Sequence, residues 1–334
     1  MPREASEYQQ RALAQVSRTF ALTIPTLPAP IRDVIGNAYL LCRIADTIED
    51  EPRLSPSSKR EYLQAFADVL SHPSRAKDFA HALGAELTDG TPQAERDLVL
   101  NSELVIDFQR CLPKGQARPI HRCIKSMCKG MAEFVETGRE GVANLAELER
   151  YCYYVAGVVG EMITDVLCDY SDEIALRREK LFALAARFGH GLQMVNILKD
   201  QHEDRQRGVN WLPQFPLHDD GHFAEMNGHS LAGHRTVELI AVAEQHLSAA
   251  LQYLLLIPNH ETGIRRFLAW SLGFAALTLR RIHANPSFNP EESVKISRRE
   301  VYVTIASTNV AIRSNRALRW LFNRATSYST RVKV

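Results

Sequence analysis

Features typical of secreted and membrane proteins are missing from this sequence. Its six cysteines include no Cys-x-x-Cys pair, and the start, Met1-Pro-Arg-Glu-Ala-Ser-Glu7, lacks the apolar stretch of a signal peptide. The longest apolar run, residues 267–279, is too short to span a bilayer, and the C-terminal end is polar. We therefore expect reduced cysteines, no terminal membrane anchor, and a cytoplasmic chain whose contact with the inner membrane is at most peripheral.

An excess of charge of either sign is also missing. The 334 residues carry 40 Lys and Arg against 39 Asp and Glu, so the net charge of +1 gives no argument for nucleic-acid binding. A hydrophobic content of 45% with 24% charged residues is typical of a soluble globular protein with a substantial core. Composition predicts nothing about oligomeric state.

Alternating strand patterns are nearly absent, whereas apolar residues recur at helical spacing along the whole chain. No repeat, low-complexity tract or Gly/Ser linker marks a domain boundary. We predict a single all-α domain over residues 1–334, with a loop over residues 208–233. The predicted helices cover residues 5–22, 31–50, 57–71, 92–111, 117–137, 145–169, 177–207, 233–256, 261–283 and 296–324.

A polar stripe marks one predicted helix at residues 193–207. At about 100° per residue, the apolar side chains of Val195, Ile197 and Leu198 point away from it. The stripe consists of Gln193, Asn196, Asp200, Glu203, Asp204 and Arg207. Such a face usually contacts water, and the alternative is that it faces a second acidic helix.

The second predicted helix ends in Asp46-Thr-Ile-Glu-Asp50, with Tyr39 and Arg43 on the same face. Like charges three and four residues apart destabilise a helix, and a cation removes their repulsion. Mg²⁺ suits these carboxylates, because its remaining positions stay on water or phosphate oxygens. A single motif of this kind is more often a solvated acidic helix end.

The pattern Asp-x-x-Glu-Asp occurs again at Asp200-Gln-His-Glu-Asp204. Antiparallel helices could present both motifs to a cavity, where cations between them would hold a diphosphate. Arg18, Arg43 and Arg207 are candidates for contacts with its outer oxygens. The repeated motif therefore predicts metal-assisted departure of a diphosphate leaving group. The expected Mg²⁺ ligands are Asp46, Glu49, Asp50, Asp200, Glu203 and Asp204.

Between the two motifs lies Tyr151-Cys-Tyr-Tyr-Val-Ala-Gly-Val-Val-Gly160. A core helix explains this segment, and so does an aromatic wall that stabilises a carbocation beside a hydrocarbon diphosphate. Lys295 and Arg298 belong to a basic cluster that is either solvated or holds a phosphate-bearing cofactor. Residues expected to be loop surface or packing are His218, His222, His229, His234, Cys123 and Cys128.

Together these motifs resemble the squalene and phytoene synthases, which condense prenyl diphosphates head to head. The resemblance runs from Ser17 to about Val303 and also rests on Ser17-Arg-Thr-Phe20 and Gly130-Met-Ala-Glu-Phe134. It implies a helical bundle of the isoprenoid-synthase type with a central cavity.

Within the family, the chain most resembles a bacterial squalene synthase. Asp46-Thr-Ile-Glu-Asp50 is similar to the squalene synthase form of the first motif, and Val294-Lys-Ile-Ser-Arg298 to the basic motif near NADPH. Ser297 stands where eukaryotic squalene synthases typically carry a basic residue, and Trp270-Ser-Leu272 where they show Pro-Gln. The expected absence of their C-terminal anchor favours the bacterial type.

The resemblance implies that Mg²⁺ assists the condensation of two farnesyl diphosphates to presqualene diphosphate, and that NADPH reduces this intermediate to squalene. Catalytic roles are implied for Tyr151, Asp50, Asp200 and Asp204. Diphosphate contacts are implied for Ser17, Arg18, Tyr39, Arg43, Gln193, Asn196, Lys199 and Arg207. Cofactor contacts are implied for Arg18, Arg43, Lys295 and Arg298, and cavity walls for Phe134, Val155 and Phe267.

Two alternatives remain. A synthase without the reductive step would release presqualene diphosphate or dehydrosqualene, as a phytoene-type enzyme does. A non-catalytic helical assembly factor, of which the family has examples, would be expected to lose acids from either motif, and both motifs are intact here.

Overall fold

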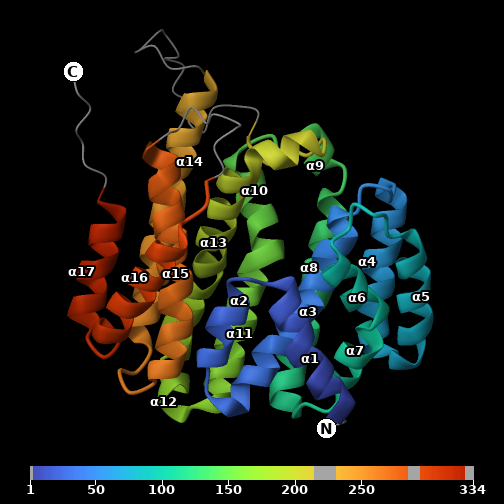
Figure 1. Cartoon of the computed structure of the whole chain (residues 1–334), viewed down its shortest axis with the longest axis horizontal. Coiled ribbons are helices and arrows are strands. Elements are labelled where there is room, and N and C mark those ends of the chain that lie inside the picture. Colours follow the sequence, from blue (N-terminus) through green and yellow to red (C-terminus); the bar gives the residue numbers. More distant parts are fainter. Residues whose placement is uncertain (1–2, 214–230, 285–293, 328–334) are drawn as a thin grey trace. The chain divides into compact units, whose positions relative to one another are not determined.

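The computed structural model describes residues 3–213, 231–284 and 294–327, and every regular element in these ranges is a helix (Figure 1). The all-α prediction is therefore confirmed. Most of the predicted loop, residues 214–230, lies outside the described residues, as do His218, His222, His229 and the side chain of His234.

The chain divides into two compact units. The first comprises Met1–Thr137 and Val158–Arg178, and the second comprises Gly138–Gly157 and Glu179–Val334. The prediction of a single domain stays a prediction. Helices of the first unit are α1 (Arg3–Val16), α2 (Phe20–Thr23), η1 (Ile24–Thr26), α3 (Ala29–Asp50), α4 (Pro56–Ser71), η2 (Pro73–Arg75), α5 (Ala76–Glu86), α6 (Gln93–Leu100), α7 (Ser102–Arg110), α8 (Lys114–Phe134), α11 (Val158–Tyr170) and α12 (Asp172–Ala175).

The second unit has the longer helices. They are α9 (Thr137–Glu140, which begins at the boundary), α10 (Leu145–Cys152), η3 (Tyr153–Gly157), α13 (Arg178–Gln206), α14 (Leu231–Leu256), α15 (Thr262–Ala284), α16 (Arg298–Ala311) and α17 (Asn315–Thr326). Within this unit α15 packs against α14, α16 and α17.

Helix α3 is the centre of the first unit, where it packs against α1, α4, α6, α7, α8 and α11. Pro28 precedes its first turn, and the backbone becomes extended at Glu51. Leu40, Ile44 and Ile48 are fully buried, and each such side chain contributes about 2 kcal/mol through removal from water. This packing fixes the helix whose last turn carries the first acidic motif (residues 46–50).

Several predicted helices are interrupted. The predicted helix 5–22 ends at Val16, and Ser17 accepts a hydrogen bond from the backbone N–H of Phe20, the first residue of α2. Ser314 caps α17 within the predicted helix 296–324, because its side chain accepts from the Ala317 N–H. The predicted helix 92–111 breaks at Asn101, and 145–169 contains the π-helical turn η3. Helix α5 was not predicted.

The segment Thr236–Leu256 of α14 is long and apolar enough to span a bilayer by length and composition alone. Just over half of its most apolar window, 56%, is buried within the protein, as expected for a core helix.

One fully buried arginine joins two turns of the second unit. Arg265 donates to the carbonyl oxygens of Ile257 and Ile312, both at 2.6 Å, and to Asn315 Oδ1 at 2.7 Å. Asn315 Nδ2 in turn donates to the Leu255 carbonyl at 3.1 Å. Burial lowers the pKa of Arg265, and the three acceptors compensate for the loss of its water.

We expect Arg265→Met to lower the free energy of unfolding by about 3 kcal/mol, because it leaves buried carbonyl groups without donors. Urea denaturation followed by circular dichroism measures this change. Arg266→Met is the matched control, since Arg266 makes one hydrogen bond, to Asn309 at the surface. Equal stabilities of the two variants would contradict the role assigned to Arg265.

Candidate active site

The first acidic motif carries more negative charge than its neighbouring cation neutralises. Arg43 Nη1 lies 3.5 Å from Asp46 Oδ2, and Arg43 Nη2 lies 2.5 Å from Glu95 Oε1. Thr47 Oγ1 lies 3.4 Å from the other Glu95 oxygen. One guanidinium is thus shared between two carboxylates. Glu95 was not predicted from the sequence, because nothing distinguishes it from other acids in the first turn of a helix.

The electrostatics of this cluster disfavour a fully ionised motif. Desolvation raises the pKa of Asp46 to about 6, Arg43 opposes the shift, and Asp50 and Glu95 add to it. The Asp46 side chain is 35% exposed, so its carboxylate remains accessible from solvent. Glu49 is half-buried and Asp50 is exposed. Hard oxygen atoms with excess negative charge fit a divalent cation such as Mg²⁺.

The predicted diphosphate-binding residues Ser17, Tyr39 and Arg43 are neighbours in the first unit. The Tyr39 ring lies 4.8 Å from that of Phe20, and its hydroxyl lies 3.4 Å from the Val16 carbonyl oxygen. Burial raises the pKa of Tyr39, while a hydrogen bond with Ser17 and the charge of Arg43 oppose the shift. Arg18 is exposed and is not part of these contacts.

The second acidic motif (residues 200–204) lies in the last turns of α13. Lys199 Nζ lies 3.1 Å from Asp200 Oδ2, and Arg207 Nη2 lies 2.9 Å from Asp204 Oδ1. Each aspartate is therefore paired with a cation from its own chain segment. Glu203 is exposed.

The polar and apolar faces of α13 lie where the sequence analysis predicts them. Val195, Ile197 and Leu198 are all at most 4% exposed, so the apolar face is the buried one. Gln193 is half-buried and Asn196 is exposed.

Tyr151 is held by an aromatic neighbour that the sequence analysis missed. Its ring is stacked on Trp211, with the centroids 3.6 Å apart and the planes 12° from parallel. Both residues are at most 9% exposed. The stack fixes the ring plane of Tyr151 within the second unit.

The segment after α13 brings Trp211 to this position. Gly208 has φ +74°, which favours glycine, and the Val209 N–H then donates to the Asp204 carbonyl at 2.9 Å. The Asn210 N–H donates to the Gly138 carbonyl at 2.8 Å. A Cβ at Gly138 would lie 3.1 Å from the Trp211 ring, so glycine permits the close approach. A short backbone path therefore links the second acidic motif to Tyr151.

The turn that follows Tyr151 is a π-helix, η3, and packs closely on α13. A Cβ at Gly189 would collide with the Ala156 carbonyl, and one at Gly157 would lie 3.1 Å from His190 Nε2. Gly157 therefore serves close packing here. Val155 is half-buried, as is Tyr154. Single π-helical turns occur frequently at functional sites.

A half-buried histidine, His190, and a buried one, His246, lie behind this turn. The rings of His190 and His246 are 5.1 Å apart, and burial lowers the pKa of each to about 4. Both are therefore neutral at physiological pH.

Ser297 has a structural role that accounts for its place in the basic motif. It caps α16 in a capping box with Glu300, whose carboxylate also accepts from Arg281 Nη2 at 2.6 Å. Lys295 and Arg298 on either side are exposed. A basic side chain at position 297 would lose this cap.

The cysteines are thiols, as predicted. All six are free, and Cys42, Cys123, Cys128 and Cys152 are buried. Burial raises the pKa of Cys128, so this thiol stays protonated as a packing group. Within the described residues, no three His, Cys, Asp or Glu side chains are placed to hold a metal by themselves. Either motif would therefore need further oxygen ligands, such as water or phosphate.

The raised pKa of Asp46 predicts a pH-dependent stability. The folded pKa is above the ordinary one, so the ionised carboxyl destabilises the fold, with the cost beginning near pH 4 and complete above pH 6. We expect Asp46→Asn to be more stable than the unsubstituted protein by about 1 kcal/mol near neutral pH, since solvent screens a one-third-exposed group. Near pH 4 the difference should vanish.

Urea denaturation across this pH range, with and without Mg²⁺, measures the effect. Mg²⁺ should reduce the difference at neutral pH, because it removes the same repulsion. Asp78→Asn, at an exposed position in α5, is the control. A stability difference for Asp46→Asn that is independent of pH would contradict the raised pKa.

The chain is similar to known proteins of one family. The family model "Squalene/phytoene synthase" matches residues 13–300. Squalene synthase ERG9 of Candida albicans is 32% identical over 282 residues, covering 81% of this chain and 60% of its own length. Squalene synthase of Yarrowia lipolytica is 30% identical with the same coverage. This chain thus spans about 60% of the length of these relatives.

The fold is also shared with a solved squalene synthase structure. The complex of TcSQS with the ligand E5700 has a TM-score of 0.73 at 23% identity, covering 97% of both chains. The isoprenoid-synthase type of all-α fold is therefore confirmed. The family match over most of the chain, together with two intact acidic motifs, shows that this chain belongs to the squalene/phytoene synthase family.

Proposed function

We propose that this chain is a squalene synthase. It condenses two farnesyl diphosphates to presqualene diphosphate and then reduces this intermediate to squalene. The observation that carries the proposal is the pair of Asp-x-x-Glu-Asp motifs, each on a helix whose opposite face is buried. The squalene synthase relatives, 30% and 32% identical, support this member of the family.

The carboxylates are suited to hold Mg²⁺. We assign this role to Asp46, Glu49, Asp50, Asp200, Glu203 and Asp204. When bound, Mg²⁺ neutralises diphosphate charge and so assists ionisation of the allylic carbon–oxygen bond. The destabilised Asp46 anion supports the assignment, because a cation would relieve its unfavourable environment.

Basic side chains stand beside the metal-binding carboxylates. Arg43, Lys199 and Arg207 are each within 3.5 Å of an aspartate of a motif. When such a carboxylate binds Mg²⁺, the arginine or lysine paired with it becomes available to bind a diphosphate oxygen. The remaining diphosphate contacts are assigned to Ser17, Arg18, Tyr39, Gln193 and Asn196.

Tyr151 is the candidate for proton transfer. Its hydroxyl would hold or move the proton lost when the cyclopropane ring of presqualene diphosphate closes, with the diphosphate assisting. Trp211 holds the Tyr151 ring in one plane, so the Tyr151 hydroxyl points in a fixed direction. Phe134, Val155 and Phe267 are assigned to the walls around the hydrocarbon.

The reductive step requires a hydride donor. Squalene synthases in general use a divalent metal and NADPH, and NADPH when bound supplies the hydride that quenches the final cation. Arg18, Arg43, Lys295 and Arg298 are assigned to its phosphates, and both Lys295 and Arg298 are exposed. Ser297 contributes by capping α16, which orders the start of that helix.

Incubation of the purified protein with farnesyl diphosphate and Mg²⁺, with and without NADPH, tests the proposal. We expect squalene only with NADPH, and presqualene diphosphate without it. An unchanged product profile would show a presqualene diphosphate or dehydrosqualene synthase instead. Asp50→Asn should lower kcat/KM about 100-fold or more, because it removes a ligand of the leaving-group metal.

Asp78→Asn is the matched control and should retain full activity, because Asp78 is an exposed residue of α5 outside both motifs. Equal activity of the Asp50→Asn variant and the unsubstituted protein would contradict the catalytic reading and favour an assembly factor.

A further inference from the structure

The last two helices form a strongly basic face of the second unit. Residues 294–327 carry seven basic side chains, all exposed, and one acidic side chain, that of Glu300. Glu300 is already paired with Arg281, at 2.6 Å. The whole chain, by contrast, has a net charge of only +1. The basic residues are Lys295, Arg298, Arg299, Arg313, Arg316, Arg319 and Arg324.

Large apolar side chains are exposed among these cations. On α16, Tyr302 is 70% exposed and Val310 is 91% exposed. On α17, Trp320 is 58% exposed, and Arg316 and Arg324 lie one turn before and after it on the same face. The Arg324 guanidinium lies 5.5 Å from the Trp320 ring centroid. Tryptophan beside arginine favours the boundary between water and lipid headgroups.

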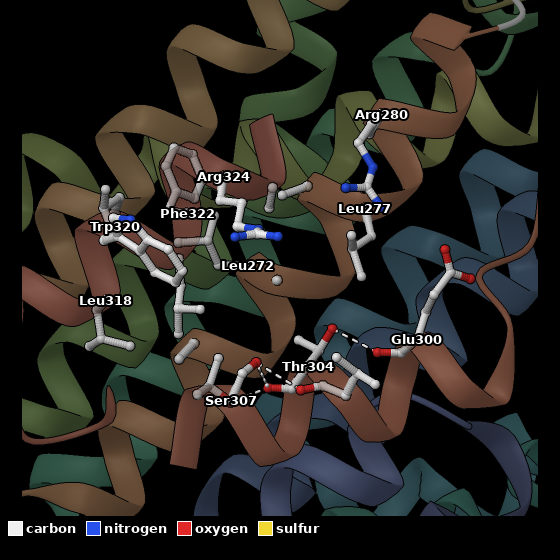
Figure 2. A pocket seen from close by; sticks show the side chains of 18 of the residues that line it. Leu272, Leu277, Arg280, Glu300, Thr304, Ser307, Leu318, Trp320, Phe322 and Arg324 are labelled. Atoms are coloured by element: carbon white, nitrogen blue, oxygen red, sulfur yellow. Dashed lines mark hydrogen bonds between the residues drawn. The ribbon is translucent and has the colours of Figure 1, made fainter. Parts of the chain in front are cut away.

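A cavity of about 580 Å³ opens beside this face, between α14, α15, α16 and α17 (Figure 2). Most of its lining is aliphatic or aromatic, and Trp320 and Val303 reach it from the exposed surface. Figure 2 shows Leu272 and Leu277 from α15 and Leu318 and Phe322 from α17 around it.

The hydroxyl groups in the lining do not make it polar. Thr304 donates to the Glu300 carbonyl at 2.8 Å, Ser307 to Val303 at 2.7 Å, and Thr308 to Thr304 at 2.6 Å. Each proton is thus used within α16, as Figure 2 shows for Thr304 and Ser307. Because these hydroxyl groups donate within their own helix, the cavity wall that a ligand contacts is mainly apolar.

Three arginines, Arg280, Arg299 and Arg324, and one acidic residue, Glu300, complete the lining of the cavity. Within the described residues none of the three has an ion pair, whereas the neighbouring Arg281 is bound by Glu300. An apolar cavity with unneutralised cations suits a molecule that has a hydrocarbon chain and an anionic head. A membrane of anionic phospholipids presents this chemistry as a surface.

We propose that the face formed by α16 and α17 docks on an anionic lipid bilayer, with the cavity receiving one acyl chain. Arg316, Arg319 and Arg324 meet the phosphate groups, and Trp320, Tyr302 and Val310 enter the headgroup region. A second copy of the chain is the less favourable occupant, because two such basic faces would repel each other. The docking does not depend on the proposed reaction, and would hold a cytoplasmic protein at the inner membrane.

Flotation of the full-length protein with vesicles tests the proposal. We expect binding to vesicles of phosphatidylcholine with about 30% phosphatidylglycerol, weakening with salt, and far less binding to phosphatidylcholine alone. The triple variant Arg316→Gln, Arg319→Gln, Arg324→Gln should lower the partition coefficient about 100-fold, at about fivefold for each arginine.

The control triple variant is Arg53→Gln, Arg75→Gln, Arg118→Gln, which removes the same charge from exposed positions of the first unit. It should bind almost as the unsubstituted protein does. Equal losses in both triple variants would overturn the proposal, as would equal binding to both vesicle types. Unchanged melting temperatures show that each variant is folded.

Quenching of tryptophan fluorescence by phosphatidylglycerol with brominated acyl chains tests whether Trp320 contacts the acyl chains. We expect quenching in the unsubstituted protein and its loss in Trp320→Phe, because Trp320 lines the cavity. Equal quenching in Trp320→Phe would overturn the entry of the chain. If sedimentation shows that the arginine triple variant dissociates a dimer, the face is a contact between copies and the proposal is wrong.

Discussion

Repulsion between carboxylates at the end of α3 is the constraint on which the site depends. Arg43 is shared between Asp46 and Glu95, so negative charge remains in excess there. Desolvation, with a further contribution from Asp50 and Glu95, raises the pKa of Asp46 to about 6. The packed apolar face of α3 holds these groups together despite the repulsion. A fold that keeps such groups together is prepared for a divalent cation before the cation arrives.

In the second unit, the acidic motif is coupled to Tyr151 through backbone geometry. The turn at Gly208 returns the chain against the end of α13, and the hydrogen bond from Asn210 to Gly138 fixes Trp211 under the tyrosine ring. The carboxylates of this second motif and the hydroxyl assigned to proton transfer therefore belong to one continuous structure within the second unit. A change at Gly138 or Gly208 would act on the orientation of Tyr151 without touching a substrate.

Helical periodicity was sufficient to predict the all-α class and the register of the polar stripe, and the family was predicted from the resemblance of several ordered motifs to known proteins. The breaks at Ser17, Asn101 and Ser314 were missed because the apolar periodicity continues across them, and at Ser314 the start of the new helix depends on a hydrogen bond to one side chain. Glu95 and Trp211 were missed because their roles arise from contacts distant in sequence. For Trp211, the only signal in the sequence was its position seven residues after the second acidic motif.

The central claim is the proposal that both acidic motifs are needed for Mg²⁺-dependent binding of diphosphate. Isothermal titration calorimetry with inorganic diphosphate tests it most directly, without turnover. The account predicts that diphosphate binds only in the presence of Mg²⁺, and that Asp50→Asn and Asp204→Asn each abolish this binding while circular dichroism shows that each variant is folded. Binding that survives the loss of either motif, or that needs no Mg²⁺, would contradict the account.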